Sequence, residues 1–243
     1  MSLARRLEPE LLDQLPADDP RAMRSRRDLK RINGLMANAR AMAAALRAGA
    51  GAVGRQPRTI VDLGSGDGQA MLRVARRLAP GWRSMTVILQ DRQDIVSAAT
   101  RQKFAALGWR AETVSADVFE FLDRSTPIDA ITANLFLHHF TAAQLTRLFA
   151  SAAKLAPLFV ACEPRRVKFV VETSRLLWLA GCNDVSVHDA VTSARAGFIG
   201  RELSALWPTP TEEADGWHLQ ERPAALFTHL FAARRVGAAR LTS

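Results

Sequence analysis

Cysteine is scarce in this sequence, which holds only Cys162 and Cys182 among its 243 residues. The two positions match no metal-ligand or redox spacing, and a chain of this length buries most of its apolar surface without disulfides. We therefore expect two reduced thiols in or near the core.

Long apolar runs are also absent, because no stretch approaches the roughly 20 apolar residues of a membrane span and the first residues show no signal-peptide pattern. These absences favour a globular protein of the cytoplasm.

Lysine is the scarce basic residue, although the net charge is +9. The lysines are Lys30, Lys103, Lys154 and Lys168, and the other basic residues are arginine. The densest basic cluster, residues 21–31, is spread around a helix rather than along one stripe. A basic chain can bind nucleic acid, but this one has no separate binding module and no interleaved aromatic residues. Nucleic-acid methylation or binding is therefore the weaker alternative.

Helical periodicity dominates the first part of the chain. Leu29, Ile32, Met42 and Leu46 belong to a pattern of three- and four-residue steps that predicts helices over residues 8–47. Several glycines and a proline over residues 49–57 end this pattern. We expect residues 1–55 to form an N-terminal helical cap and residues 56–243 to form the main domain.

Short apolar strands and amphipathic helices then alternate. Strands are expected near residues 59–61, 85–89, 110–115, 128–133 and 158–161, with helices between them, including 69–78 and 95–107. This alternation implies parallel strands joined by right-handed crossovers. A helical insertion at about residues 165–207 precedes two more strands, near 217–221 and 226–233. The sequence predicts an α/β fold: a doubly wound, mostly parallel seven-stranded sheet with an antiparallel edge strand, an N-terminal helical extension and a helical insertion after strand five.

A glycine-rich loop stands where the first strand meets the next helix. Asp62, Gly64, Gly66 and Gly68 occupy alternate positions, which lets the backbone turn tightly and approach a ligand closely. The dinucleotide fingerprint G-x-G-x-x-G has a different spacing. The loop, with Ser65 inside it, resembles motif I of the class I (Rossmann-like) S-adenosylmethionine-dependent methyltransferases. In that family the loop wraps the methionine and ribose part of the cofactor.

The resemblance covers roughly residues 58–162 and implies further cofactor contacts. Asp91, followed by Arg92, stands where the family has an acidic residue on the ribose hydroxyls. Asp117, followed by Val118, matches the acidic residue that meets the adenine amino group, although Asp117 alone is equally well explained as a helix N-cap. Asn134 ends the fourth strand beside the expected cofactor. The resemblance thus implies S-adenosyl-L-methionine as cofactor.

Two segments beyond the fourth strand suggest the class of acceptor. Residues 134–140 resemble the small-molecule branch of the family, which acts on quinone precursors, phenols and polyketides, and residues 187–198 lie where that branch inserts acceptor-binding helices. The chain has no loop of the Asn-Pro-Pro-Tyr type used by DNA amine methyltransferases. We expect O-methylation of a phenolic or polyketide-like metabolite of secondary metabolism, with C-methylation close behind. A nicotinamide-dependent oxidoreductase and a non-catalytic relative remain as rivals.

A catalytic base is sought among five histidines. His188 precedes Asp189 in the expected acceptor-binding insertion, and a carboxylate can raise a histidine's pKa and fix its tautomer. A structural pair at a helix start explains these two residues equally well. His188 is our first choice for the base and His139 our second, while packing roles are preferred for the others. We expect no metal site, because no cluster of Asp, Glu and Asn near the motifs resembles a hard-cation site.

Overall fold

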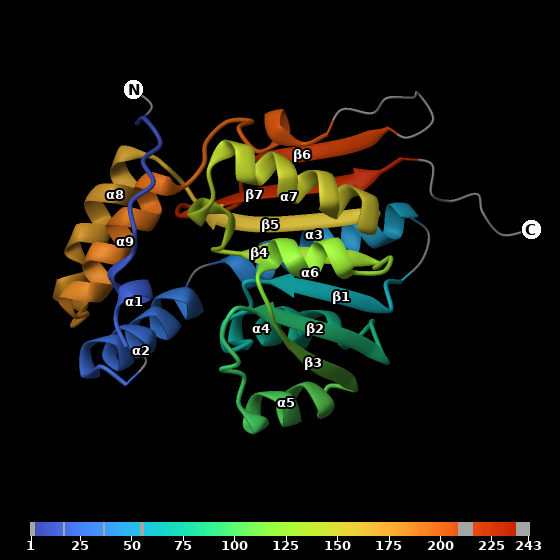
Figure 1. Ribbon diagram of the computed structural model, residues 1–243, viewed down its shortest axis with the longest axis horizontal. Helices are drawn as coiled ribbons and strands as arrows, with labels where there is room; N and C mark the ends of the chain where they lie inside the picture. Colours follow the sequence, from blue (N-terminus) through green and yellow to red (C-terminus); the bar gives the residue numbers. More distant parts are fainter. Residues whose placement is uncertain (1–2, 17, 36, 54–55, 209–215, 237–243) are drawn as a thin grey trace, which may run out of the picture.

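The computed structural model describes residues 3–16, 18–35, 37–53, 56–208 and 216–236. Its centre is one seven-stranded sheet with the strand order β3-β2-β1-β4-β5-β7-β6 (Figure 1). The strands are β1 (Thr59–Leu63), β2 (Met85–Asp91), β3 (Trp109–Ser115), β4 (Ala130–Asn134), β5 (Leu158–Pro164), β6 (Trp217–Pro223) and β7 (Thr228–Arg235). The strand order reverses between β1 and β4, and ligands of doubly wound sheets bind at such a point.

The strand directions confirm the expected fold class. β1 to β5 pair in parallel, and β7 pairs antiparallel with both β5 and β6. The antiparallel strand therefore lies one place inside the edge, which β6 forms. β5 is buried along its whole length, as a strand covered on both faces must be, and this explains its continuous apolar run.

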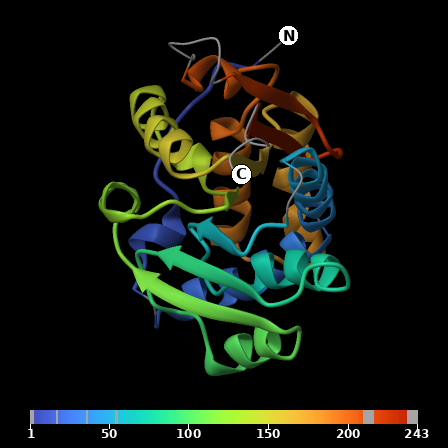
Figure 2. The ribbon, with the colours of Figure 1, turned by 90° about the vertical axis from the view of Figure 1, so that its right-hand side faces the viewer.

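Helices cover both faces of the sheet (Figure 2). One face carries α3 (Asn38–Val53), α4 (Gln69–Leu78) and α5 (Ala98–Ala105), and the other carries α6 (Val118–Arg124) and α7 (Ala142–Leu155). The apolar stripe of α4, including Met71 and Leu78, packs on the first face, and Leu148 and Phe149 of α7 pack on the second. Within the described ranges, no helix combines the length and apolar character needed to cross a bilayer.

A third group of helices lies beside one end of the sheet (Figure 1). It consists of α1 (Leu11–Gln14), α2 (Pro20–Leu35), α8 (Lys168–Arg175) and α9 (Asp184–Ala196), with the 3₁₀ turn η2 (Leu176–Ala180). A further turn, η3 (Ser204–Leu206), packs against α7. α9 contacts α1, α2, α8 and the 3₁₀ turn η1 (Leu137–His139), which follows β4. The group therefore lies at the carboxyl ends of the strands.

The helix α3 packs differently from the helices before it. Its contacts are with α4, β5 and β7, and a side chain at Gly49 would come within 2.5 Å of Leu158 on β5. Part of the expected cap at residues 1–55 thus rests on the sheet, and residues 54–55 lie outside the described chain. We keep the division into cap and main domain as a proposal and place its boundary between α2 and α3.

Candidate functional site

The glycine loop between β1 and α4 has the backbone that its composition predicts. Gly64, Gly66 and Gly68 have φ angles of 64°, 55° and 74°, which glycine adopts at low cost. A Cβ atom at Gly64 would lie 2.1 Å from the ring of Phe136, whereas one at Gly66 would meet no heavy atom within 4 Å. Gly64 is therefore fixed by internal packing, while Gly66 borders open space that a ligand can fill.

The loop is tied to the carboxyl end of β2. Ser65 N donates to Gln90 O over 2.9 Å, and Gly66 N donates to Asp91 Oδ2 over 2.8 Å. The other Asp91 oxygen accepts from Gln93 N at 3.0 Å. Among the described residues, the buried Ser65 Oγ has no hydrogen-bond partner. Because buried polar atoms are normally paired, this hydroxyl is suited to a polar ligand group.

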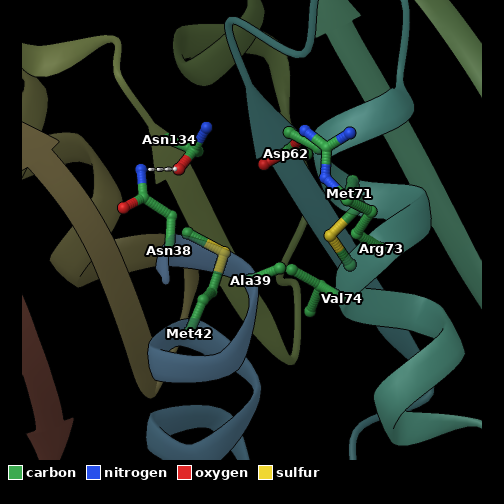
Figure 3. Close-up of a pocket in the computed structure, with 9 residues that line it drawn as sticks. Asn38, Ala39, Met42, Asp62, Met71, Arg73, Val74 and Asn134 are labelled. Atoms are coloured by element: carbon green, nitrogen blue, oxygen red, sulfur yellow. Dashed lines mark hydrogen bonds between the residues drawn. The ribbon is translucent and has the colours of Figure 1, made fainter. Parts of the chain in front are cut away.

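A small pocket lies beside the loop, between α3, α4 and the ends of β1 and β4 (Figure 3). Its polar wall is formed by Asn38, Asp62, Arg73 and Asn134, and its apolar wall by Ala39, Met42, Ala70, Met71 and Val74. Asn38 Nδ2 donates to Asn134 Oδ1 over 2.9 Å, as the dashed line in Figure 3 marks. The pocket thus offers amide groups and both signs of charge within an apolar frame.

The charges of the pocket are perturbed by burial. Asp62 is buried, and desolvation, aided by the charge of Asp91, raises its pKa to about 7, although a 2.7 Å hydrogen bond from Thr132 Oγ1 opposes the shift. Burial also lowers the pKa of Arg73. A ligand that carries a cation toward Asp62 and an anion toward Arg73 would relieve both penalties.

The remaining predicted cofactor residues lie at neighbouring strand ends. Asp117 is exposed and caps α6, since its Oδ1 accepts from Phe119 N at 2.9 Å, while Val118 is buried. Arg92 is exposed after β2. The geometry brings the loop, Asp91 and Asn134 together, whereas the N-cap explanation accounts fully for the contacts of Asp117 in this structure.

His138, in η1, lies between two carboxylates. Its Nδ1 lies 2.8 Å from Glu163 Oε2, and its Nε2 lies 3.5 Å from Glu10 Oε1. Glu163 also accepts from the backbone nitrogens of Phe136 and Leu137 at 3.0 and 2.9 Å. Burial disfavours the charged ring, but the two carboxylates of Glu10 and Glu163 outweigh it and raise the pKa of His138 to about 9. His138 is thus part of a buried ionic cluster.

The candidate bases His188 and His139 are both exposed. His188 Nδ1 lies 3.1 Å from Asp189 Oδ1 on α9. The buried Asp189 also accepts from Leu11 N and Leu12 N, at 2.8 and 3.0 Å, and so caps α1. The pair therefore does not sit at the start of its own helix, and its carboxylate is shared with the backbone of the N-terminal segment.

Four polar residues of this region were not anticipated from the sequence. Asn38 and Arg73 come from the helices on either side of the pocket, and Glu10 and Glu163 surround His138. Glu163 could have been recognised from the sequence, because it is a charged residue at the end of an apolar strand. A charge in that position needs either a ligand or a buried partner. The other three had no such signal, because each acts through a contact distant in sequence.

Comparison with known protein families matches the part of the chain that contains the glycine loop. The family model described as "Methyltransferase domain" matches residues 60–156. That range begins in β1 and ends just after α7, so it contains the glycine loop, Asp91 and Asp117. No curated protein sequence matches the chain.

Solved structures are similar over most of the chain. The plantazolicin methyltransferase BpumL in complex with SAH has a TM-score of 0.61 at 14% identity, covering 92% of this chain and 93% of that one. The plantazolicin methyltransferase BamL, with a triazolic desmethylPZN analog and SAH, has a TM-score of 0.62 at 13% identity, covering 91% and 92%. An O-methyltransferase family protein from Burkholderia thailandensis has a TM-score of 0.53 at 22% identity, covering 90% and 61%. At these identities the likeness establishes the fold.

Proposed function

We propose that this chain, a class I, S-adenosylmethionine-dependent methyltransferase with its methyltransferase domain at residues 60–156, methylates an oxygen of a small phenolic or polyketide-like metabolite in the cytoplasm. The observation that carries the proposal is the hydrogen bond between the glycine loop and Asp91, at the point where the strand order reverses. The cofactor supplies a methyl group already activated on a sulfonium, so the protein's task is to position the acceptor and remove its proton.

The pocket beside the loop suits the methionine end of the cofactor. That end carries an ammonium and a carboxylate, and we assign the ammonium to Asp62 and the carboxylate to Arg73. The two side chains lie on the same side of the pocket in Figure 3, with the Asn38–Asn134 pair opposite. Ser65 Oγ and the open space beside Gly66 fit a ligand that crosses the loop. We assign the ribose hydroxyls to Asp91, which accepts protons, and the adenine to the region of Asp117 and Val118.

An aromatic cluster borders the same strand ends and favours a flat acceptor. The ring of Phe140 meets those of Phe136 and Phe119 edge to face, with centroids 5.0 and 5.8 Å apart. All three rings are only partly buried, so they offer aromatic surface next to the loop. The group of α1, α2, α8 and α9 lies at this end of the sheet, and we propose that it covers the acceptor.

The proton of the acceptor needs a base at neutral pH, because a phenol has a pKa of about 10. We retain His188 as the first choice. Its Nδ1 is held by Asp189, which leaves Nε2 to take a proton from the acceptor. His139, exposed beside the buried His138, is the second choice.

The proposal is tested with S-adenosylmethionine that carries an isotopically labelled methyl group. The chain is incubated separately with simple phenols, with hydroxyquinones and polyketide-type hydroxyaromatics, and with duplex DNA and RNA. We expect label in the hydroxyaromatic products as a methoxy group, identified by mass spectrometry and NMR. Label on carbon would move the assignment to C-methylation of a quinone or polyketide precursor. Label in nucleic acid, with none in the small molecules, would overturn the acceptor class.

A further inference from the structure

Three potential metal ligands converge beside the turn that follows β4. They are Glu10 of the N-terminal segment and the neighbours His138 and His139 of η1, and their ligand atoms all lie within 4.8 Å of one another. Glu10 is partly buried, His138 is buried and His139 is exposed. The cluster plays no part in the cofactor contacts assigned above.

The ring of His138 has the orientation that is usual for a metal-binding histidine, with a carboxylate on one nitrogen and the other nitrogen facing the cluster. Its Nδ1 lies 2.8 Å from Glu163 Oε2, and Glu163 is itself fixed by the backbone nitrogens of Phe136 and Leu137. A carboxylate on one ring nitrogen keeps a proton there, so an ion that displaces the proton of the other nitrogen finds its lone pair directed outward. The Nε2 atom is buried and, within the described part of the chain, makes no hydrogen bond of ordinary geometry. Glu10 lies on that side of the ring, with its Oε1 at 3.5 Å from Nε2.

The separation of Nε2 and Glu10 Oε1 suits two ligands of one ion. At 3.5 Å it exceeds the usual range of about 2.7–3.2 Å for an N–H···O hydrogen bond. Two ligands at about 2.0–2.1 Å from a tetrahedral zinc lie roughly 3.3–3.4 Å apart, which is close to the observed distance. Glu10 is held in place by Ser193 Oγ, which donates to the same oxygen, Oε1.

We propose that Glu10, His138 and His139 bind a borderline transition-metal dication such as Zn²⁺, with Glu163 orienting His138. Two imidazoles and one carboxylate are ligands that this class of ion accepts, whereas Mg²⁺ and Ca²⁺ prefer oxygen alone. This proposal departs from the sequence-based expectation of no metal site, which rested on the lack of an oxygen cluster of the hard-cation kind. Glu10 stands 128 residues before His138, so no spacing rule could join the two.

Such an ion ties the N-terminal segment to the carboxyl end of β4. Arg5 already donates to the carbonyl oxygens of His138 and Phe140, at 3.1 and 3.0 Å, so the segment lies along the same turn. Three protein ligands leave a fourth position for water or for an oxygen of a small ligand. His139 cannot bind the metal and act as the base at the same time, because a nitrogen that coordinates an ion has no lone pair for a proton.

The test uses the full chain, stripped of metal with a chelator and titrated with Co²⁺ and with Zn²⁺. Tetrahedral Co²⁺ gives intense visible absorption, and Zn²⁺ displaces it. We expect one equivalent to bind, with an increase in Tm. His139→Gln alters an exposed ligand and so should fold; it should weaken Zn²⁺ binding at least about tenfold. Glu163→Gln, which keeps the shape of the group behind His138 but removes its charge, should weaken Zn²⁺ binding about ten- to hundredfold.

Two controls separate this site from adventitious binding. His218→Gln removes an exposed histidine on β6, and Cys182→Ser removes a partly exposed thiol. Both should bind Zn²⁺ like the unmodified chain. The proposal is overturned if neither metal binds, if His139→Gln binds as tightly as the unmodified chain, or if a control abolishes binding. The readout is independent of methyl transfer, so failure here would leave the proposed function standing.

Discussion

Asp91 Oδ2 accepts a hydrogen bond of 2.8 Å from Gly66 N, so the carboxylate at the end of β2 holds the glycine loop that follows β1. A carboxylate here has acceptor capacity for the backbone and for a diol. Asp91→Asn keeps the shape but loses the charge and half of the acceptors. We expect the affinity for S-adenosylmethionine to fall about 10- to 150-fold, equivalent to roughly 1.5–3 kcal/mol for hydrogen bonds to a charged group. Calorimetry measures this, and Asp94→Asn, which changes an exposed neighbour, should bind normally.

The buried Asp62 makes stability and cofactor affinity depend on pH. Its folded-state pKa of about 7 exceeds the unfolded value of about 3.9, so the folded chain binds the proton more tightly between these limits. The contribution to the free energy of unfolding is therefore present below about pH 4 and is lost as the pH rises to about 7, by at most about 4 kcal/mol. Asp62→Asn should remove this dependence, which denaturant unfolding at several pH values would measure.

The same carboxylate should link cofactor binding to proton release. An ammonium beside Asp62 favours the ionised carboxylate, so the affinity for S-adenosylmethionine should rise between pH 6 and pH 8 in the unmodified chain. Asp62→Asn should bind more weakly and with no such rise. An equally steep pH profile in Asp62→Asn would place the ammonium elsewhere.

Arg73 is the predicted partner of the cofactor carboxylate. Arg73→Met retains much of the apolar stem and removes the charge, and it should weaken the binding of S-adenosylmethionine about 10- to 150-fold. The matched control is Arg76→Met, which alters an exposed arginine on the same helix. If the two variants bind alike, the pocket does not hold the methionine end of the cofactor.

The base assignment predicts a loss of turnover without a loss of cofactor affinity. His188→Ala should reduce turnover by roughly 10²–10⁴-fold, and His218→Ala serves as the control for an exposed histidine. Rates must be measured below the acceptor's pKa, because a phenol that ionises unaided would mask the effect. If His188→Ala is fully active while His139→Ala fails, the base lies after β4. If both are active, positioning alone drives the transfer.

Local patterns were sufficient for the sheet and the loop. The helix from Gln69 to Leu78 has the bounds that its apolar spacing predicted, and the glycines that were expected to allow a tight turn have positive φ angles. Those patterns could not predict which element packs against a given helix face. The alanine-rich face of α3 is compatible with a cap or with a sheet, and its contacts with β5 and β7, including the close approach of Gly49 to Leu158, decide between them.

The polar contacts of the site were beyond prediction for the same reason. Glu10 and His138, or Asn38 and Asn134, come from segments that meet only in the folded chain. His188 and Asp189 show the opposite case, because their adjacency suggested a catalytic pair, whereas the carboxylate also caps α1. A motif predicts what the backbone does locally, and the tertiary fold decides which side chains share a site.

The central claim, that the glycine loop holds S-adenosylmethionine, is tested most directly by comparing two glycines. Gly66 and Gly200 have φ angles of 55° and 60°, and a Cβ atom at either would meet no heavy atom within 4 Å. Gly66→Ala and Gly200→Ala therefore incur the same backbone strain, about 1–2 kcal/mol, and should lower the free energy of unfolding equally. In calorimetric titration with S-adenosylhomocysteine, the unmodified chain and Gly200→Ala should bind alike and Gly66→Ala at least about tenfold more weakly. Equal binding by both variants, or no binding by the unmodified chain, would contradict the claim.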